Sequence, residues 1–591
     1  MGRINDLGAF INQLSTMMRD VYSINKQSGL TILTARIVGS ILPLVQLYLV
    51  KELIDLIGQP SQTTNQIILL VSLFGVIQLA LGTLNQYTNH IEQLFSQEVA
   101  DAFSLRIITK SSLVEYGHFE NPAFHNSLHL AQQQARYRIT QLLPAINASI
   151  SNAMSLIFLV VFFISIKAYF FIAIFVLAIP ITLNKWLQGK RSTDLEFRLA
   201  PKERESGYLF QLMTGIQWAK ELRTFRFGKA FQDRFQVLRK EIYQEKSLIQ
   251  KKSLQQNMIV EFFEVTALGL AIGYLAVKTV AKSIGLGTFV LYLQGIQRMQ
   301  TSSKAFFQSL LQVFQLRSFV KDLYGFFELS EGHKQSTEHH FPDHLDQLSI
   351  KSLSFRYPNQ QQPIISGINI EASRGQIIAI VGENGSGKST LVKLLAGFYT
   401  ADQGSIQLDG INIQDIEQPA FFQQTCFFFQ DYEKYFLTAG QNIHFEYNST
   451  DLVEKKASEA GETSGASSFI QKLANGYQTK MGSIFEGSEQ LSGGQWQKLA
   501  LARIFYKDAQ LVVLDEPSSA LDAFAELNLY EKIKNNLKNK IVILISHRLY
   551  NLKIADKIHV MQDGKIVQSG NFEQLITEDG LFRSMYEKQR I

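Results

Sequence analysis

Residues 382–389 combine glycines, a lysine and a serine in the pattern G-x-x-x-x-G-K-S, directly after the apolar run 377–381. Glycines in such a loop let backbone N–H groups close around phosphate oxygens, and the helix that follows presents its positive N-terminus to the same anion. Lys388 can reach the β and γ phosphates of a nucleotide, and the Ser389 hydroxyl can ligate magnesium. We therefore predict a nucleotide site that includes Gly382, Asn384, Gly385, Ser386, Gly387, Lys388, Ser389 and Thr390.

A second apolar run, 511–514, ends in two carboxylates, Asp515 and Glu516. A buried strand that delivers one carboxylate to magnesium, with a second carboxylate beside it to polarise a water, is suited to hydrolysis of a phosphoanhydride. We predict that Asp515 positions the metal and that Glu516 is the general base. His547 closely follows a third apolar run, 541–545, and could contact the γ-phosphate, although taken alone it is an ordinary residue at a strand end.

About 125 residues separate Lys388 from Asp515, which is far more than a single βαβ step needs. We therefore predict an inserted subdomain. It contains the sequence Leu-Ser-Gly-Gly-Gln at 491–495, directly before the helical stretch 495–505. That helix would form a second anion-binding N-terminus, which cannot reach its own phosphate loop from an inserted subdomain. We expect it to serve a nucleotide bound to another molecule.

The sequence at 491–495 resembles the signature of ATP-binding cassette (ABC) proteins, and the other motifs follow in the order of that family. The resemblance implies an ATPase that uses ATP and Mg²⁺. Tyr357 resembles the aromatic residue that stacks on adenine, Gln430 the Q-loop glutamine and His547 the switch histidine. The implied catalytic set is Glu516, His547 and Gln430, and the implied magnesium set is Ser389, Gln430 and Asp515. Residues 519–522 resemble the D-loop of the family. Further nucleotide contacts are assigned to Ser492, Gly493, Gly494, Gln495 and, in the D-loop, Asp522.

The same resemblance implies a homodimer. Two chains would pair head to tail around two ATP molecules, so that each site combines the phosphate loop of one chain with the signature of the other. Closure of the cassettes would switch the helical bundles from inward-open to outward-open. Every catalytic position is intact, so both sites are expected to hydrolyse ATP.

The composition points to a membrane, because 46% of the 591 residues are hydrophobic and 18% are charged, against roughly 25% charged in soluble proteins. Six apolar runs are each near the roughly 20 residues that span a bilayer: 30–57, 67–84, 142–166, 168–187, 258–280 and 286–306. We predict a six-helix transmembrane bundle with long cytoplasmic helical extensions, followed by an α/β P-loop ATP-binding cassette with an inserted helical subdomain. The expected boundaries are 1–330 for the transmembrane domain, 331–344 for a linker and 345–591 for the cassette.

Lysine and arginine concentrate in the long connection 185–252. By the positive-inside rule, this connection, the long connection 86–141, both termini and the cassette are cytoplasmic. Helix breaks at 117–122 and 215–228 could form short transverse helices that dock on a soluble domain. The formal charge of +5 therefore reflects topology, and nucleic acid is not expected as a partner.

Residues 427–435 and 491–498 look like the corresponding segments of lantibiotic exporters of the nisin-transporter type, with Trp496 as the mark. The resemblance implies export of a ribosomally made, modified peptide with its leader, across the bacterial plasma membrane and with the help of membrane-associated modification enzymes. Related exporters that cut the leader have an N-terminal cysteine-protease domain, which we do not expect here. The alternative reading of Trp496 is an aromatic residue that packs a helix and has no bearing on the substrate.

Three other functions are alternatives at this point. An importer is the least expected of them, because importers usually have their membrane and ATPase domains on separate chains. A multidrug or lipid exporter would share every cassette motif. A cassette ATPase that acts on nucleic acid or ribosomes, without transport, is excluded only if the six apolar runs insert into a membrane.

Three single residues also carry expectations. The only cysteine, Cys426, is predicted to be a buried strand thiol, and it allows no disulfide within one chain. Glu261 and Glu264 share one helix face at the entry to the fifth apolar run. They either pair with bundle cations such as Arg36 or Arg298, lie in the hydrated cytoplasmic extension of the helix, or line an inward-open cavity that attracts a cationic peptide.

Overall fold

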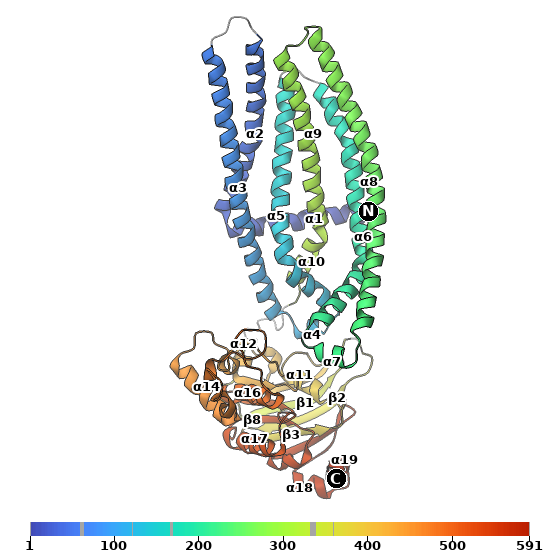
Figure 1. The fold of residues 1–591 in the computed structure, drawn as a ribbon. Helices are drawn as coiled ribbons and strands as arrows, with labels where there is room; N and C mark the ends of the chain where they lie inside the picture. Colours follow the sequence, from blue (N-terminus) through green and yellow to red (C-terminus); the bar gives the residue numbers. More distant parts are fainter. Residues whose placement is uncertain are drawn as a thin grey trace. The chain divides into compact units, whose positions relative to one another are not determined.

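The computed structural model describes residues 2–58, 64–120, 122–165, 170–330, 339–358 and 360–589. The chain divides into two compact units. The helical unit comprises Met1–Ser112 and Pro122–Leu329, and the cassette unit comprises Leu113–Asn121 and Ser330–Ile591. The segment Leu113–Asn121 thus belongs to the cassette unit although it lies in the first long connection of the helical part (Figure 1).

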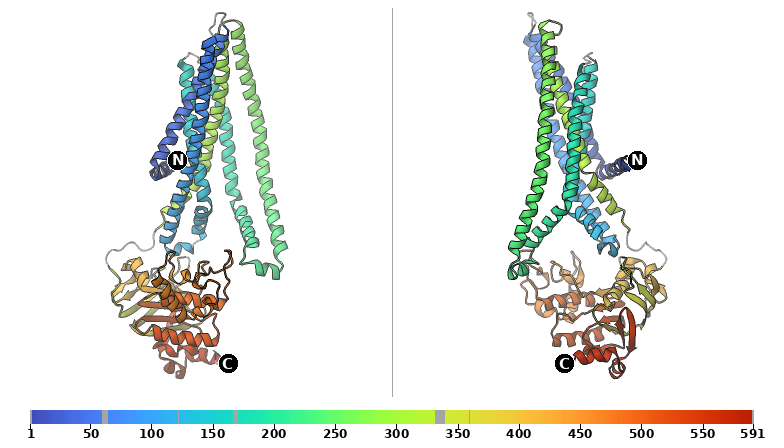
Figure 2. Two further views of the ribbon diagram at one scale, coloured as in Figure 1. Left: turned by 60° about the vertical axis from the view of Figure 1, so that its left-hand side comes forward. Right: turned by 90° about the vertical axis from the view of Figure 1, so that its right-hand side faces the viewer.

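The helical unit is built from long helices, of which α6 and α8 run side by side (Figure 2). Its elements are α1 (Gly2–Ile24), α2 (Lys26–Ile57), α3 (Thr64–Leu113), α5 (Pro122–Ser165), α6 (Phe170–Thr214), α7 (Ala219–Thr224), α8 (Gly228–Val280), α9 (Leu286–Gln315) and α10 (Arg317–Phe327). Each of the six predicted apolar runs lies mainly within one of these helices, namely α2, α3, α5, α6, α8 and α9. Several of the helices extend far beyond their apolar run, as predicted.

Within the described residues, four helical stretches are long and apolar enough to cross a membrane: Lys26–Ile57, Thr64–Leu113, Tyr137–Ile164 and Gly228–Val280. The predicted run 168–187 falls largely on residues whose side chains lie outside the description. The predicted run 286–306 is helical but is not among the four, because α9 combines an apolar face with a polar one. Its apolar face packs Leu291, Ile296 and Met299 against Phe163 of α5.

A close approach fixes α9 against α2. The N–H of Gly287 donates to Oδ1 of Asp55 at 2.9 Å. A Cβ atom at Gly287 would clash with the carbonyl oxygen of Lys51, so only glycine fits at this crossing.

Glu264 is a structural ion-pair residue. Its Oε1 lies 2.7 Å from Nζ of Lys304 on α9 and also accepts a hydrogen bond from Gln300. The side chain of Glu264 is only 10% exposed, whereas Glu261 is exposed. The expectation of an ion pair therefore holds for Glu264. Its partner is Lys304 of α9, which packs against α8, and not Arg36 or Arg298.

The cassette unit contains two sheets. A four-stranded sheet has the order β2-β1-β4-β5, and a six-stranded sheet has the order β10-β9-β3-β8-β7-β6. In the larger sheet β3 pairs in parallel with β9 and β8, and β8, β7 and β6 continue in parallel, while β10 is antiparallel to β9. The strands are β1 (Gln347–Phe355), β2 (Ile365–Ser373), β3 (Ile377–Gly382), β4 (Gln403–Leu408), β5 (Ile411–Asn412), β6 (Thr425–Phe428), β7 (Leu511–Asp515), β8 (Ile541–Ile545), β9 (Lys557–Gln562) and β10 (Lys565–Gly570).

Helices surround these sheets, and one group of them forms the predicted inserted subdomain. That group comprises α13 (Gln441–His444), α14 (Asp451–Ser464), α15 (Ser467–Ile470) and α16 (Gly493–Tyr506), and it has its own apolar core. The other helices are α4 (Tyr116–Phe119), α11 (Lys388–Leu395), α12 (Gln418–Gln424), α17 (Ala523–Asn536), α18 (Phe572–Thr577) and α19 (Leu581–Gln589), with 3-10 turns at Ile413–Asp415, Gly476–Gln478 and Leu549–Ile554.

The side chains of Trp496 and Cys426 are both buried in the cassette unit. Trp496 is 1% exposed and lies in the core of the inserted subdomain. Cys426 is buried in β6, as predicted, and burial raises the pKa of its thiol.

Candidate active site

The phosphate loop connects the buried central strand β3 to α11. Gly385 and Gly387 have φ values of 84° and 103°, in the left-handed region that favours glycine. A Cβ atom at Gly387 would also lie 3.1 Å from the carbonyl oxygen of Ile364. Both glycines are therefore needed for the shape of the loop.

Lys388 is buried inside this loop. Its Nζ donates to the carbonyl oxygens of Gly382 at 2.9 Å and Glu383 at 2.8 Å, and it lies 3.4 Å from Oγ of Ser386. Burial lowers the pKa of Lys388. The ammonium group is thus held where the backbone N–H groups of the loop can share an anion with it.

Glu516 joins two residues from other parts of the chain. Its Oε1 lies 2.6 Å from Nε2 of His547, and its Oε2 accepts a hydrogen bond of 3.1 Å from Nε2 of Gln430. Glu516 has a φ of 49°, and its N–H donates to the carbonyl oxygen of Ile545 at 3.0 Å. The structure therefore brings together the three residues of the predicted catalytic set at the carboxyl ends of parallel strands.

Asp515 is the last residue of β7 and is 4% exposed. Burial and the neighbouring charge of Glu516 raise its pKa to about 6. Ser389 is exposed in the first turn of α11. One buried carboxylate with hydroxyl and amide oxygens nearby in the fold fits Mg²⁺, which commonly takes one or two carboxylates and completes its shell with waters and substrate phosphates. No cluster of three His, Cys, Asp or Glu side chains suited to a metal occurs among the described residues.

The signature residues form the N-terminus of α16. Ser492 is the N-cap residue: its Oγ accepts from the N–H of Gln495 at 3.3 Å, and Oε1 of Gln495 accepts from the N–H of Ser492 at 2.8 Å. Gly493 and Gly494 form the first turn, and Gly494 lies so close to the D-loop that a Cβ atom would be 3.1 Å from the carbonyl oxygen of Ala520. In the described part of the chain, no hydrogen bond joins residues 492–495 to the phosphate loop of the same chain.

Two predicted nucleotide contacts have local partners in the fold. Tyr357 is half-buried, and its hydroxyl lies 3.3 Å from Oγ1 of Thr390. Asp522 caps α17, because its Oδ1 accepts from the N–H of Ala525 at 2.8 Å. The N-cap position explains an aspartate there without any nucleotide.

The transverse helix α4 docks on the cassette near Tyr357. Tyr116 of α4 stacks on Phe398 with ring centroids 4.5 Å apart. Glu120 lies 2.6 Å from Nζ of Lys393 and accepts from the hydroxyl of Tyr399 at 2.5 Å. The ring of Tyr399 in turn meets the ring of Tyr357 edge-on, at 5.3 Å. The predicted docking is thus confirmed for the first helix break.

The fully buried Gln497 was not predicted. Its Nε2 donates to the carbonyl oxygen of Pro517 at 2.9 Å and to Oγ of Ser519 at 3.2 Å. Its Oε1 accepts from the N–H of Ala520 at 2.9 Å. Gln497 therefore ties the signature helix to the D-loop. The signal in the sequence was a glutamine two residues beyond the signature, in a helix that is otherwise largely apolar.

The fully buried Glu526 was also missed. Its Oε1 accepts from the hydroxyl of Ser518 at 2.5 Å, and its Oε2 accepts from the hydroxyl of Tyr550 at 2.8 Å and pairs with NH1 of Arg548. Ser518 lies two residues after Glu516, and Arg548 directly follows His547. Glu526 thus holds both segments that carry the Glu516–His547 contact.

Residues 365–519 match the family model described as ABC transporter. This segment is the ATPase domain of an ABC transporter. The whole chain also has the fold of an ABC exporter: a solved structure of a bacterial Atm1-family ABC exporter with ATP bound aligns with a TM-score of 0.79, covering 96% of this chain and 98% of that chain at 18% identity. The ABC transporter ATPase domain indicates ATP hydrolysis coupled to transport.

Two transport ATP-binding proteins are similar to this chain over nearly its full length. The subtilin transport ATP-binding protein SpaT of Bacillus subtilis is 28% identical over 99% of this chain and 96% of its own. The nisin transport ATP-binding protein NisT of Lactococcus lactis is 28% identical over 98% of this chain and 96% of its own length. An ATP-dependent lipid A-core flippase of Vibrio vulnificus is 30% identical, but over 60% of each chain.

Proposed function

We propose that the chain forms a homodimer that uses ATP to export a modified, leader-bearing peptide of the lantibiotic type across the bacterial plasma membrane. The observation that carries the ATP-driven step is the hydrogen-bonded set of Glu516, His547 and Gln430 beside the phosphate loop. The peptide class is supported by similarity along the whole chain to the transport proteins for subtilin and nisin.

In the proposed reaction, Lys388 exchanges its bonds to loop carbonyls for phosphate oxygens of ATP. Asp515, Ser389 and Gln430 would hold Mg²⁺, which neutralises charge on the phosphates when bound. Glu516 orients the attacking water and accepts its proton. Burial lowers the pKa of the His547 imidazole and leaves a neutral ring with one N–H donor. That N–H fixes the Glu516 carboxylate in this structure, and in the proposed reaction it turns to the γ-phosphate when ATP is bound.

The dimer follows from the position of the signature. The capped N-terminus of α16 presents N–H groups to an anion, yet in the described residues it has no bond to the phosphate loop of its own chain. A second copy would supply that loop. Each of the two ATP sites would then contain Tyr357 and Glu516 from one chain and Ser492 from the other, with Asp522 at the boundary.

The orientation and the remaining partners belong to the same proposal. By the positive-inside rule, the basic connections support a cytoplasmic position for the cassette and both termini. A peptide cargo that is modified before export would be handed over by membrane-associated modification enzymes.

Stimulation of ATP hydrolysis tests the substrate class. The protein is reconstituted in liposomes, and a leader-bearing lantibiotic precursor is compared with lipid A-type lipids and hydrophobic dyes. We expect the peptide to raise turnover severalfold above the basal rate and the other compounds to have little effect. Stimulation by lipid alone would favour the lipid exporter, which is the second candidate because of the similarity to the lipid A-core flippase.

A further inference from the structure

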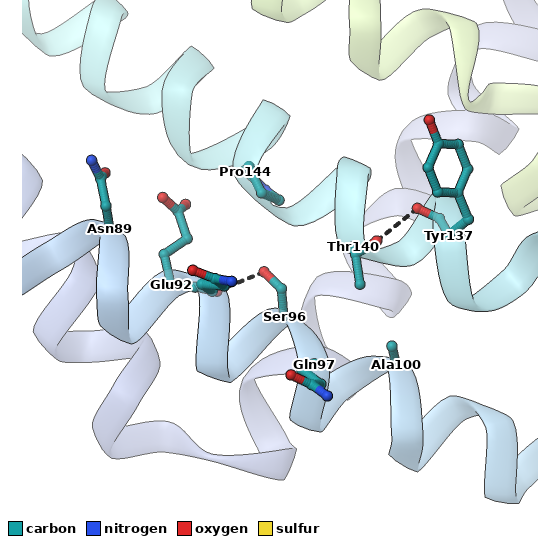
Figure 3. Close-up of a pocket in the computed structure, with 9 residues that line it drawn as sticks. Asn89, Glu92, Ser96, Gln97, Ala100, Tyr137, Thr140 and Pro144 are labelled. Atoms are coloured by element: carbon teal, nitrogen blue, oxygen red, sulfur yellow. Dashed lines mark hydrogen bonds between the residues drawn. The ribbon is translucent and has the colours of Figure 1, made fainter.

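A cavity of about 750 Å³ lies in the helical unit between α3 and α5, and most of the residues that line it carry an amide, hydroxyl or carboxylate group. Figure 3 shows that Asn89, Ser96 and Gln97 come from one wall and Tyr137 and Thr140 from the other. This volume lies in the range of sites that bind small molecules or short peptide segments. The lining combines amide and hydroxyl groups, so the cavity is suited to a ligand rich in hydrogen-bonding groups.

Three amides form a row on α3. Asn89, Gln93 and Gln97 line the cavity at intervals of four residues, so they lie on one helix face about 6 Å apart. All three are exposed, and within the described residues the side-chain amides of Gln93 and Gln97 have no hydrogen-bond partner. The amides of Gln93 and Gln97 each offer both a donor and an acceptor, whereas Oδ1 of Asn89 already accepts a hydrogen bond from NH2 of Arg36 at 2.9 Å.

The spacing of this row resembles that of an extended peptide. Alternate residues of a β-strand present their backbone N–H and C=O groups to one side at intervals of about 6.6–6.8 Å. A row of amides about 6 Å apart can therefore pair with alternate peptide units of an extended chain, without reading its side chains.

The α5 wall offers a further acceptor. Pro144 lines the cavity and has no N–H, so the carbonyl oxygen of Thr140 lacks its usual donor in the helix. The hydroxyl of Thr140 donates to the carbonyl oxygen of Tyr137 at 2.8 Å (Figure 3). Because Pro144 cannot donate to it, the carbonyl oxygen of Thr140 retains capacity to accept a bond from a peptide N–H.

The charge at the cavity is compensated. Glu92 is 6% exposed; its Oε2 lies 2.6 Å from NH2 of Arg36, and its Oε1 accepts from Asn147 at 2.6 Å. The described lining residues include no lysine or arginine. Arg36 reaches the lining residues Asn89 and Glu92 but is already paired with the Glu92 carboxylate, so a phosphate headgroup would find no unpaired cation among the described lining residues and their ion-pair partners, and a free anion would meet Glu92.

We propose that this cavity binds the backbone of an extended segment of the exported peptide. This inference rests on the proposed function and identifies the surface that the exported peptide would contact. The amide row lies about one turn beyond the apolar run 67–84 of α3. On the predicted topology, the cavity is therefore near the cytoplasmic boundary of the membrane, where a peptide enters.

The test replaces two amides by leucines of similar size, in the variant Gln93→Leu/Gln97→Leu of the full chain. The matched control is Gln232→Leu/Gln236→Leu, which removes two exposed glutamines at the same spacing from α8 of the same unit. Both variants are reconstituted in nanodiscs, and the affinity for a fluorescent leader-bearing lantibiotic precursor is measured together with basal ATPase. We expect the affinity to fall about tenfold in the α3 variant with basal ATPase unchanged, and both the affinity and the basal ATPase to stay unchanged in the control.

A second probe tests recognition of the backbone. A precursor that is N-methylated at alternate peptide bonds keeps its side chains but loses N–H donors. It should bind wild type as weakly as the unmethylated peptide binds the α3 variant, with little further loss when both changes are combined.

The possible outcomes separate the cavity proposal from the proposed function. If wild type binds the peptide and the α3 variant binds it equally well, the cavity proposal is overturned while the proposed function stands. The cavity proposal is overturned in the same way if the α3 variant changes only the response to anionic lipid. If wild type neither binds the peptide nor responds to it, the proposed function fails, and the cavity proposal fails with it.

Discussion

Nε2 of His547 lies 2.6 Å from Oε1 of Glu516, which makes a direct contact between the end of β8 and the end of β7. The other oxygen of Glu516 is held by Gln430 after β6. The two strands on either side of β7 thus each bring one side chain to the carboxylate that follows β7. Because the strands are rigid and buried, the carboxylate is positioned before any nucleotide arrives.

Removal of the basic charge from Glu516 should separate binding from hydrolysis. Glu516→Gln keeps the shape and the hydrogen bond from His547, so ATP should bind with nearly unchanged affinity while turnover falls roughly 10²-fold or more. Nucleotide binding and phosphate release measure the two effects. Glu531→Gln, at an exposed position of α17, is the control. Near-normal turnover of Glu516→Gln would show that the general base is elsewhere.

The raised pKa of Asp515 predicts that replacement of this carboxylate stabilises the cassette, although the same replacement should abolish activity. Folding raises this pKa from 3.8 to about 6, so the folded protein is favoured while the group is protonated, and this stabilisation is lost as the pH rises through about 6. Without nucleotide and metal, Asp515→Asn should therefore stabilise the cassette at pH 7.5 by about 2–3 kcal/mol. The gain should disappear below about pH 4, where the wild-type carboxyl is protonated in both states.

Denaturation of both proteins at pH 7.5 and pH 4, together with ATPase at pH 7.5, checks this prediction. We expect Asp515→Asn to be more stable at the higher pH and inactive. A variant that is less stable than wild type at pH 7.5 would contradict the assigned cost of burying this charge.

Glu526 should affect turnover although it lies behind the catalytic pair. Glu526→Gln leaves Arg548 without a counter-ion and weakens the bond from Ser518, which should cost about 3 kcal/mol of stability and misplace the segments that carry Glu516 and His547. We expect kcat to fall more than the affinity for ATP.

A double variant distinguishes the cost of the unpaired Arg548 charge from the role of Glu526 in positioning the catalytic segments. Glu526→Gln/Arg548→Met removes the unpaired cation and should recover much of the lost stability but not the turnover. If turnover returned together with stability, Glu526 would matter only for folding.

The ion pair of Glu264 predicts unequal roles for two glutamates that the sequence made look equivalent. Glu264→Gln should lower the melting temperature in detergent by about 2–4 °C, because Lys304 loses its partner. Glu261→Gln, at an exposed position, should have little effect. Equal losses in the two variants would contradict the pairing.

The cassette could be predicted from its sequence because its chemistry lies in short segments. The phosphate loop, the carboxylates after β7 and the signature each combine a turn or cap requirement with a chemical one. Glu526 and Gln497 were not predicted, because their partners come from other segments: Arg548 is 22 residues from Glu526, and Ala520 is 23 residues from Gln497. A single sequence contains no sign of such pairs.

The structure of the helical unit could also be predicted only in part from the sequence. Apolar length predicted the long helices, but α9 has a polar face that includes Gln300 and Lys304, so composition alone does not mark it as a span. The amide row of α3 reads as a solvated helix face until α5 is placed opposite to it. Trp496 packs the inserted subdomain, as one of its two readings expected, and this position neither supports nor opposes the peptide substrate.

ATP-dependent uptake of a labelled, leader-bearing lantibiotic precursor into inside-out proteoliposomes tests the central claim most directly. Cassettes that face outward receive ATP and peptide from the same side. We predict that wild type accumulates the peptide in the lumen only with ATP and Mg²⁺, and that Glu516→Gln binds ATP but accumulates none. Wild-type protein that hydrolyses ATP without accumulating peptide, while it moves labelled lipid between leaflets, would contradict the proposed peptide export.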